Sequence, residues 1–452
     1  MQFFESTKHF LKNEPTPIER IVTPFQRFAS VKAAGGIILF LSALIAILWA
    51  NFISYESYDN FWHTKFTIGV GRYSISDSFH FWINDALMAV FFFLVGLEIK
   101  RSIVLGELSS IKKAAFPVMA AAGGMIVPAV MFISLNINTD TVVGWGIPVA
   151  TDIAFALGVL SVLGKRVPIS LKIFLTALAI ADDIGAVLII AIFYSNDLML
   201  NNLIISFLLL GGIVIANYLG LRNPFIYIVV GCLMWIFFLK SGIHATIAGI
   251  TLAMVIPLKV KINPNQFFHK ATELLDNFKN ENTFHQSKGS LGLTTEKQSA
   301  TLEELVKHTK EVESPLQRME NNLHHFVTFV VLPLFAISNS GVIIDSNVTS
   351  IFNNSLAIGI ILGLFIGKPI GILSFSYLAY KTGIASIPDD IKWRHVLGVG
   401  FLGGVGFTMA IFVNGLAFNT DLYISTAKIA IFIASILSGI FGYLTIRMVK
   451  DK

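Results

Sequence analysis

Apolar runs long enough to cross a membrane recur along the whole of this 452-residue chain. A helix needs about 20 apolar residues to span the roughly 30 Å hydrocarbon core of a bilayer. Twelve stretches approach that length: residues 33–53, 81–99, 114–135, 143–163, 170–194, 201–219, 224–239, 242–258, 323–344, 354–378, 394–417 and 422–446. The sequence therefore predicts an all-α polytopic membrane protein with about twelve transmembrane helices and lipid as its solvent.

The charged residues agree with this prediction and set an orientation. Only 13% of the residues are charged, against about 25% in soluble domains. Lys and Arg lie mostly between the apolar runs, where orientation signals belong, so the net charge of +5 does not indicate a nucleic-acid partner. With the N-terminus in the cytoplasm, cytoplasmic segments hold 28 of the 33 Lys and Arg. Both termini are therefore predicted to be cytoplasmic.

The predicted spans divide the chain into five segments. Residues 1–32 form a cytoplasmic N-terminal segment, 33–258 the first eight spans, 259–322 a hydrophilic cytoplasmic segment, 323–447 the last four spans and 448–452 a tail. The composition of 259–322 favours a mobile inserted loop, with helical patches allowed around 267–281 and 301–312. The single cysteine, Cys232, lies in an apolar run, so no disulfide framework or cysteine metal site is expected.

Ionisable residues inside apolar runs are the most informative part of such a sequence. Each costs a few kcal/mol on insertion scales, so their presence indicates function. Those at mid-span are Asp152, Asp182, Asp183 and Lys368, and those nearer the ends of their spans are Asp85, Glu98 and His244. Three central aspartates therefore face one central lysine.

The adjacent pair Asp182–Asp183 lies at the middle of LKIFLTALAIADDIGAVLIIAIF. Neighbours on a helix point about 100° apart, so one carboxylate can face a cationic partner while the other faces a water-filled cavity. The alternative is a pair that only links helices, which a single Asn or Ser would do at lower cost. Lys368, in LGLFIGKPIGIL, is expected to pair with a buried aspartate, because it is far from either end of its run.

Two spans are interrupted. In GWGIPVATDIAFALGVL, Pro148 removes a helical hydrogen bond, and Thr151 with Asp152 offers hard oxygen ligands suited to a small cation. A kinked helix with a capping Asp is the alternative. The other span, LGVGFLGGVGFTMAIFVNGLAF, has five glycines from 398 to 406, which by themselves indicate close packing. The first interrupted span is the middle one of the three predicted spans in 114–194, and the other is the middle one of the three in 354–446. These corresponding positions predict an inverted-repeat transporter with broken helices at about 143–163 and 394–417.

The buried charges predict a mechanism. Burial and nearby like charges both favour the protonated form of a carboxylate, and a sodium ion would satisfy the same negative charge. Protons and sodium then compete for the same oxygens, which is the minimum that exchange by alternating access requires. If two protons replace one sodium, the membrane potential drives the cycle with about 2.3 kcal/mol per charge per 100 mV.

Several segments resemble the NhaA sodium/proton antiporter family, which is itself a known example of paired interrupted spans. They are WINDALMAVFFFLVGLEIKR, VATDIAFALGVL, LTALAIADDIGAVLIIAIFY, LKSGIHATIAGI, VLPLFAISNSGV, IGKPIGI and GVGFTMAIF. The resemblance runs from about residue 30 to 447, apart from 259–322. It implies a multi-pass protein of the bacterial inner membrane that exchanges cytoplasmic Na⁺ or Li⁺ for external H⁺, without a cofactor, and a homodimer is compatible with it.

The same resemblance implies roles for the central residues. Asp183 would be the main cation ligand and proton carrier, and Asp152 and Thr151 would complete the sodium site. Asp182 would form an ion pair with Lys368 that is made or broken as protons move.

Other residues would serve access and regulation. Asp85 and Glu98 would shape the access route, although they are 13 positions apart in the sequence, which is about 20 Å along a helix, so they cannot form one site. Glu320 and His324, in MENNLHHFV, match a stretch linked to pH activation. His244 fits the family pattern near the periplasmic side and fits a hydrogen-bonded structural histidine equally well.

Three other classes of protein fit this sequence less well. A passive cation channel needs rings of weak sites, whereas buried Asp with Lys makes strong protonatable ones. A sodium-coupled symporter of related fold needs anion-binding groups. An enzyme is least expected, since the spans contain no nucleophile–base pair and no metal-ligand cluster.

Overall fold

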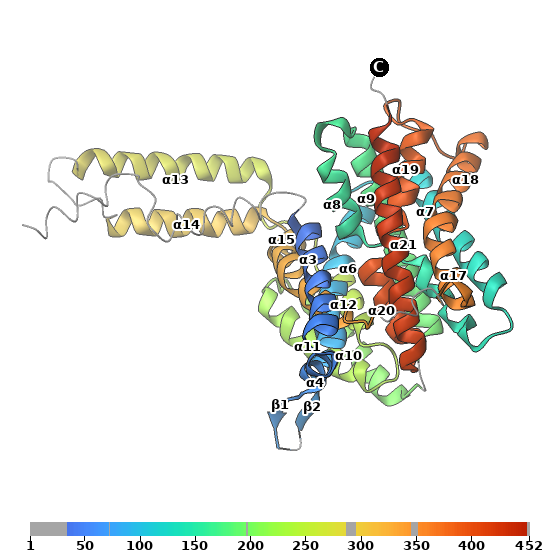
Figure 1. Ribbon diagram of the computed structural model, residues 1–452. Coiled ribbons are helices and arrows are strands. Elements are labelled where there is room, and N and C mark those ends of the chain that lie inside the picture. Colours follow the sequence, from blue (N-terminus) through green and yellow to red (C-terminus); the bar gives the residue numbers. More distant parts are fainter. Residues whose placement is uncertain (1–33, 72, 196–197, 286–294, 345–350, 450–452) are drawn as a thin grey trace, which may run out of the picture. The chain divides into compact units, whose positions relative to one another are not determined.

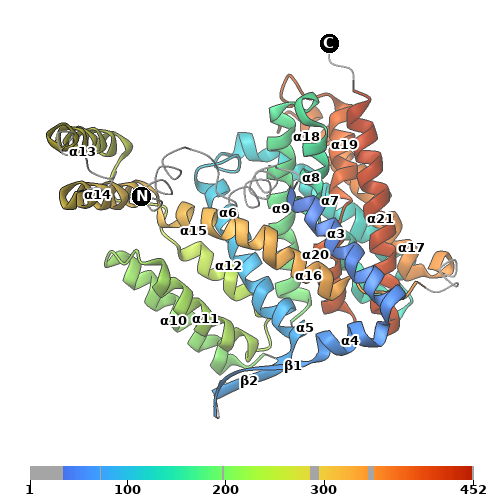
Figure 2. The ribbon, with the colours of Figure 1, turned by 60° about the vertical axis from the view of Figure 1, so that its left-hand side comes forward.

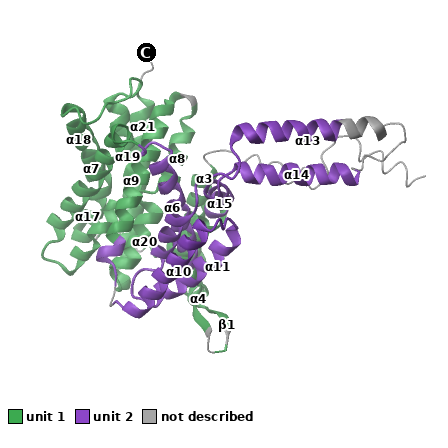
Figure 3. Cartoon of the chain, turned by 180° about the vertical axis from the view of Figure 1, so that it is seen from behind, with its two compact units in different colours: residues 1–83, 110–189, 328–452 green, residues 84–109, 190–327 purple. Residues whose placement is uncertain are grey.

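The computed structural model describes residues 34–71, 73–195, 198–285, 295–344 and 351–449. The predicted N-terminal segment 1–32 and residues 450–452 of the predicted tail lie outside this part. Figure 3 shows that the chain divides into two compact units, residues 1–83, 110–189 and 328–452 in the first and residues 84–109 and 190–327 in the second. Each unit is described by itself.

The first unit is mostly helical, and its helices are labelled in Figure 1. Its elements are α3 (Ala34–Leu48), α4 (Tyr55–His63), β1 (Lys65–Val70), β2 (Tyr73–Ser78), α5 (Phe79–Phe81), α7 (Ile111–Asn136), α8 (Ile153–Val162), α9 (Ile169–Phe193, to residue 189), α16 (Leu332–Asn339), α17 (Ser355–Leu362), α18 (Lys368–Lys381), α19 (Trp393–Gly403), α20 (Phe407–Ala417) and α21 (Asp421–Arg447).

The second unit is also helical. Its helices are α6 (Met88–Val104), α10 (Leu200–Tyr218), α11 (Pro224–Leu239), α12 (Thr246–Val255), α13 (Pro264–His285), α14 (Glu296–Val312) and α15 (Pro315–Phe326). Figure 2 shows α10 and α11 running side by side. Short π-helical segments occupy Trp49–Ile53, Trp82–Leu87, Val327–Val331 and Gly363–Gly367, and 3₁₀ segments occupy Asp140–Val149, here called η3, and Gly164–Arg166.

Apolar helices of membrane-spanning length confirm the multi-pass prediction. Within the described ranges, seven helices are long and apolar enough to cross a bilayer, or nine if each of two bent pairs counts as one span. The helices α11 and α12 are apolar but shorter. The number of twelve spans stays a prediction.

Both interrupted spans are broken helices, as predicted. The pair η3 and α8 bends by 43°, and the pair α19 and α20 bends by 44°. At the first break the backbone is extended at Ala150 and Asp152, directly after Pro148 near the end of η3. At the second, α19 ends at Gly403 and α20 begins at Phe407. The chain thus leaves the helical hydrogen-bond ladder where its Gly, Pro and Asp residues are concentrated.

Close contact between α7 and α18 holds the start of α18 in place. A Cβ atom on either Gly123 or Gly371 would lie 2.1 Å from the carbonyl oxygen of the other, so only glycine fits at this crossing. Gly367 meets Pro128 in the same way, at 3.0 Å from its Cα. This contact fixes the backbone beside Lys368, the first residue of α18.

The described residues are mostly helical, as predicted, and depart from an all-α protein at one place. Strands β1 and β2 pair antiparallel, from Lys65 opposite Ser78 to Val70 opposite Tyr73. Alternating polar and apolar residues favour strands here, and Gly71 supplies the positive φ of 56° that the turn needs. The strands are short and lie outside the long apolar runs that dominate the sequence.

Within the hydrophilic segment 259–322, residues 264–285 and 296–312 form two helices. Helices α13 and α14 pack on each other and contain the helical patches allowed at 267–281 and 301–312. A capping box of Thr295 with Gln298 starts α14. In α13, half-buried residues recur at helical spacing: Phe267, Ala271, Leu274 and Phe278. That periodicity outweighs the polar composition.

Candidate ion-binding site

The Lys368 ammonium forms a buried ion pair with Asp182. Its Nζ lies 2.7 Å from Oδ2 of Asp182, and the two residues are 0% and 1% exposed. Lys368 begins α18 and Asp182 lies at the middle of α9. The resemblance to a known family implies this pair, and the structure brings the two side chains together. At such burial each charge depends on the other for its compensation.

Thr151 joins the ion pair to the break in α19–α20. Its hydroxyl oxygen accepts a hydrogen bond from Lys368 Nζ at 2.7 Å. The hydroxyl has two acceptors within reach, Oδ2 of Asp182 at 2.7 Å and the carbonyl oxygen of Gly403 at 2.8 Å. A hydroxyl carries one proton, so it donates to only one of them at a time. Thr151 can therefore exchange its partner without moving its backbone.

Asp152 holds the two breaks together. Its backbone N–H donates to the carbonyl of Val405 at 2.7 Å. Its carboxylate is the N-cap of α8, accepting from the Phe155 N–H at 2.9 Å. The other carboxylate oxygen accepts from Thr408, from the N–H at 3.1 Å and from the hydroxyl at 2.5 Å. Asp152 therefore caps a helix, which was the alternative interpretation of this residue from the sequence.

Sequence reasoning did not single out Thr408, although GVGFTMAIF contains it. Thr408 is 2% exposed and lies in the first turn of α20. A hydroxyl residue in the first turn after a glycine-rich break is a signal that could have been used, because such residues bond groups at helix starts.

Asp183 follows Asp182 on α9 and is 5% exposed. Helical geometry turns its side chain about 100° from that of Asp182, which faces Lys368. Nearby on α9, a Cβ on Gly185 would lie 2.1 Å from the Met125 sulfur on α7. Among the described residues, Oδ1 of Asp182 has no hydrogen-bond partner although it is buried. The segment thus offers carboxylate oxygen that a cation, a proton or water can engage.

In the second unit, Asp85 lies beside His244. The distance from Asp85 Oδ1 to His244 Nε2 is 3.8 Å, and the other ring nitrogen of His244 is 2.9 Å from the Thr246 hydroxyl. Both residues are candidates from the sequence, but no sequence pattern predicts that they meet. The contact of His244 with Thr246 fits the interpretation of His244 as a hydrogen-bonded structural histidine.

Glu98, Glu320 and His324 are also brought close together. His324 Nδ1 is 3.9 Å from Glu98 Oε1, and Glu320 Oε1 is 3.1 Å from the guanidinium of Arg101. Glu98 and Arg101 lie on α6, and Glu320 and His324 on α15. Sequence reasoning missed Arg101. Its position three residues after Glu98, on one face of the helix, was the available signal.

The second break should be sensitive to added volume. A Cβ on Gly404 would lie 2.2 Å from the Leu364 carbonyl oxygen and 2.7 Å from the Ser438 hydroxyl. Gly404→Ala is therefore expected to destabilise the protein by about 1–3 kcal/mol, seen as a lower melting temperature of the purified protein. Gly415→Ala is the matched control, because nothing lies within 4 Å of its added carbon. Equal melting of the two variants would contradict the close contact.

Comparison with known proteins identifies the family of the chain. The model of the Na⁺/H⁺ antiporter 1 family matches residues 26–446. Na⁺/H⁺ antiporter NhaA 1 of Saccharophagus degradans is 43% identical over 449 residues, 97% of this chain and 96% of that protein. Na⁺/H⁺ antiporter NhaA of Wolinella succinogenes is 46% identical over 421 residues, 93% and 92% of the two chains. This chain therefore belongs to the Na⁺/H⁺ antiporter 1 family.

Proposed function

We propose that this chain is a secondary active transporter that exchanges Na⁺ for H⁺ across the membrane. The observation that carries the proposal is the meeting of two broken helices at Asp152, whose backbone and carboxylate bind Val405 and Thr408 across the breaks. Hydroxyl, carbonyl and carboxylate oxygens are the ligands that small hard cations prefer. The names of the relatives support the same substrates.

Competition for oxygen ligands would couple the two ions. Asp183 and Asp152 would bind Na⁺ together with Thr151, and protons would bind the same carboxylates when Na⁺ leaves. The Lys368–Asp182 pair would compensate charge while the site changes occupant. Alternating access would then export one ion as the other enters, and unequal charge would make the cycle electrogenic.

The two alternative functions have less support. A symporter of an organic anion needs an unpaired cation in its substrate pocket, but the mid-span Lys368 has Asp182 and Thr151 as partners. A channel does not need a buried ion pair next to a titratable carboxylate. Exchange accounts for both features.

The remaining details belong to the same proposal. The chain would have twelve spans arranged as an inverted repeat in the bacterial inner membrane, with both termini and 259–322 on the cytoplasmic side. Li⁺ would be a second substrate, and the protein would work as a homodimer. Asp85, His244 and Glu98 would line the access route. Glu320 and His324 would set the pH response.

Everted membrane vesicles carrying the protein test this function. After respiration acidifies the lumen, addition of Na⁺ or Li⁺ should release the pH gradient, and K⁺ should not. Vesicles without the protein are the control. A transporter moves protons only when the counter-cation is added. Dissipation of the gradient without added cation, or an equal response to K⁺, would contradict exchange.

A further inference from the structure

The hydroxyl of Thr408 is used differently from those of two threonines on α21. Thr426 and Thr445 each donate to the carbonyl four residues earlier in their own helix, at 2.7 and 2.6 Å. The residue four positions before Thr408 is Gly404, which lies in the break between α19 and α20. Thr408 donates instead to Oδ2 of Asp152, at 2.5 Å, on the other broken span. Its hydroxyl therefore serves the crossing of the two broken spans and not its own helix.

The start of α20 is capped without this hydroxyl. The backbone N–H of Thr408 already donates to the same Asp152 oxygen at 3.1 Å, and the Phe407 N–H donates to the Ser435 hydroxyl at 3.2 Å. Two of the N–H groups that a helix start leaves unpaired are thus satisfied by other residues. Thr408 and Asp152 are each 2% exposed. What the hydroxyl adds is one more buried oxygen atom beside a carboxylate.

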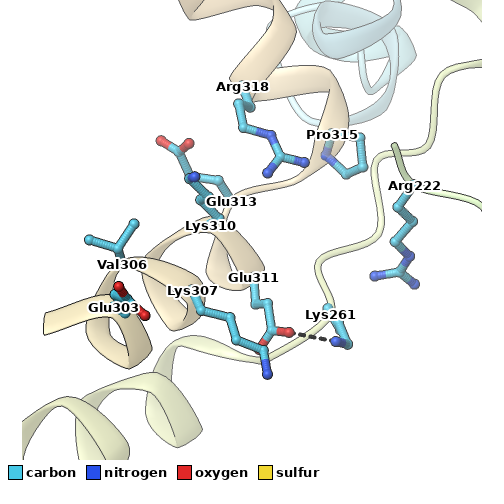
Figure 4. Close-up of a pocket in the computed structure, with 10 residues that line it drawn as sticks. All are labelled: Arg222, Lys261, Glu303, Val306, Lys307, Lys310, Glu311, Glu313, Pro315 and Arg318. Atoms are coloured by element: carbon cyan, nitrogen blue, oxygen red, sulfur yellow. Dashed lines mark hydrogen bonds and ion pairs between the residues drawn. The ribbon is translucent and has the colours of Figure 1, made fainter. Parts of the chain in front are cut away.

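Other oxygen atoms of the two breaks gather at this crossing. The Thr151 hydroxyl contacts the carbonyl oxygen of Gly403 at 2.8 Å, and a Cβ on Gly406 would lie 3.3 Å from the carbonyl oxygen of Ala150. These residues belong to the first unit, whereas the pocket drawn in Figure 4 is lined by residues of the second unit. Hydroxyl, carbonyl and carboxylate oxygens, the ligands that hard cations prefer, therefore come together from both breaks.

We propose that the Thr408 hydroxyl is a further ligand of the transported cation and favours Na⁺ over Li⁺, a role that rests on the exchange function proposed above. Hard cations lie about 2.0–2.6 Å from their oxygen ligands, so one ion can contact two oxygens that are 2.5 Å apart. The hydroxyl gives its proton to the Asp152 carboxylate and keeps its lone pairs for the ion. Its backbone N–H meanwhile holds the start of α20 against the same carboxylate.

The number of oxygen ligands distinguishes the two ions. Selectivity between hard cations depends on the size and flexibility of the site and on its ligand number, and the larger ion takes more oxygens. Na⁺ is larger than Li⁺, so it loses more when one ligand is removed. Thr408→Val keeps the shape of the side chain and removes the hydroxyl. It should raise the KM for Na⁺ at least about tenfold and the KM for Li⁺ less, so that the ratio of the two KM values changes.

Exchange in everted vesicles, measured against Na⁺ and against Li⁺, gives the KM and the maximal rate of each variant. Thr408→Ser and Thr408→Ala differ from each other only in the hydroxyl, so the serine variant should keep a low KM for Na⁺ and the alanine variant should resemble Thr408→Val. Thr426→Val is the matched control, because this buried threonine bonds a carbonyl of its own helix. It should leave both KM values unchanged.

A second measurement does not depend on transport. Sodium chloride, compared with choline chloride at equal ionic strength, should raise the melting temperature of the purified full-length protein, because a bound ligand stabilises the folded state. The rise should persist in Thr408→Ser and be smaller in Thr408→Ala and Thr408→Val. If the unmodified protein does not exchange Na⁺ for H⁺, the exchange function is wrong, and the sodium-dependent melting still decides whether Thr408 binds the ion.

Two results would overturn the role of Thr408. One is a lower melting temperature and maximal rate in Thr408→Val with both KM values unchanged, which would make the hydroxyl a packing contact only. The other is an equal KM for Na⁺ in the serine and alanine variants, together with an equal rise in their melting temperatures on addition of sodium.

Discussion

Asp183→Asn should abolish sodium-dependent proton exchange while the protein inserts and folds normally. Asparagine has nearly the same shape but cannot carry a proton, and its neutral oxygen binds Na⁺ less well than a carboxylate does. Loss of a supporting ligand typically costs about 10–100-fold in metal affinity, so loss of the central one should reduce exchange by at least about a hundredfold. The measurement is the cation-induced release of the pH gradient in everted vesicles.

The chain contains its own control for this change. Asp389–Asp390 is a second adjacent pair of aspartates, exposed and outside the spans. Asp389→Asn removes the same charge without touching the buried site, and it should transport normally. Normal exchange by correctly inserted Asp183→Asn would show that another residue carries the ion.

Asp182→Asn should cause the largest loss of stability. It leaves the Lys368 ammonium buried without a counter-charge, which typically costs about 3–5 kcal/mol. The expected result is a clearly lower melting temperature of the purified protein together with impaired exchange. Neither effect depends on Asp183, which keeps its carboxylate in this variant.

A double variant separates charge compensation from simple loss of contacts. Replacing Lys368 with Met in the Asp182→Asn background removes both buried charges, and such replacements are often neutral or stabilising. The double variant should therefore melt closer to the unmodified protein than either single variant does. If the loss of stability in the double variant equals the sum of the losses in the two single variants, the ion pair does not couple these residues.

The sequence predicts those parts of the fold that depend on the residues of one short segment. Gly144, Gly146 and Pro148 cannot continue a regular helix easily, so the break before Asp152 follows from their backbone preferences. The apolar runs gave the multi-pass architecture, because only helices satisfy the backbone in lipid over such lengths. In 259–322 the polar composition favours a loop, whereas the spacing of half-buried residues in α13 favours the helix that forms there.

Contacts between distant residues were harder to obtain from the sequence. Asp152 and Thr408 are 256 residues apart, and no local pattern shows that they bond. The pairing of Asp85 with His244 likewise depends on how α6 and α12 pack. Lys368 was assigned a buried aspartate on charge alone, but a resemblance was needed to choose Asp182 over Asp152 or Asp183. Counting charges gives the number of partners and not their identity.

The bonds of Asp152 make it a clasp between two half-helices. One carboxylate oxygen accepts a hydrogen bond from a backbone N–H in the first turn of α8, and the other accepts one from a backbone N–H in the first turn of α20. Negative charge at a helix start is stabilising, and a neutral acid is less so. Any ligand that neutralises this carboxylate therefore loosens the beginnings of both half-helices at once. The binding of a ligand at this carboxylate and the stability of the two helix starts are therefore linked through a single side chain.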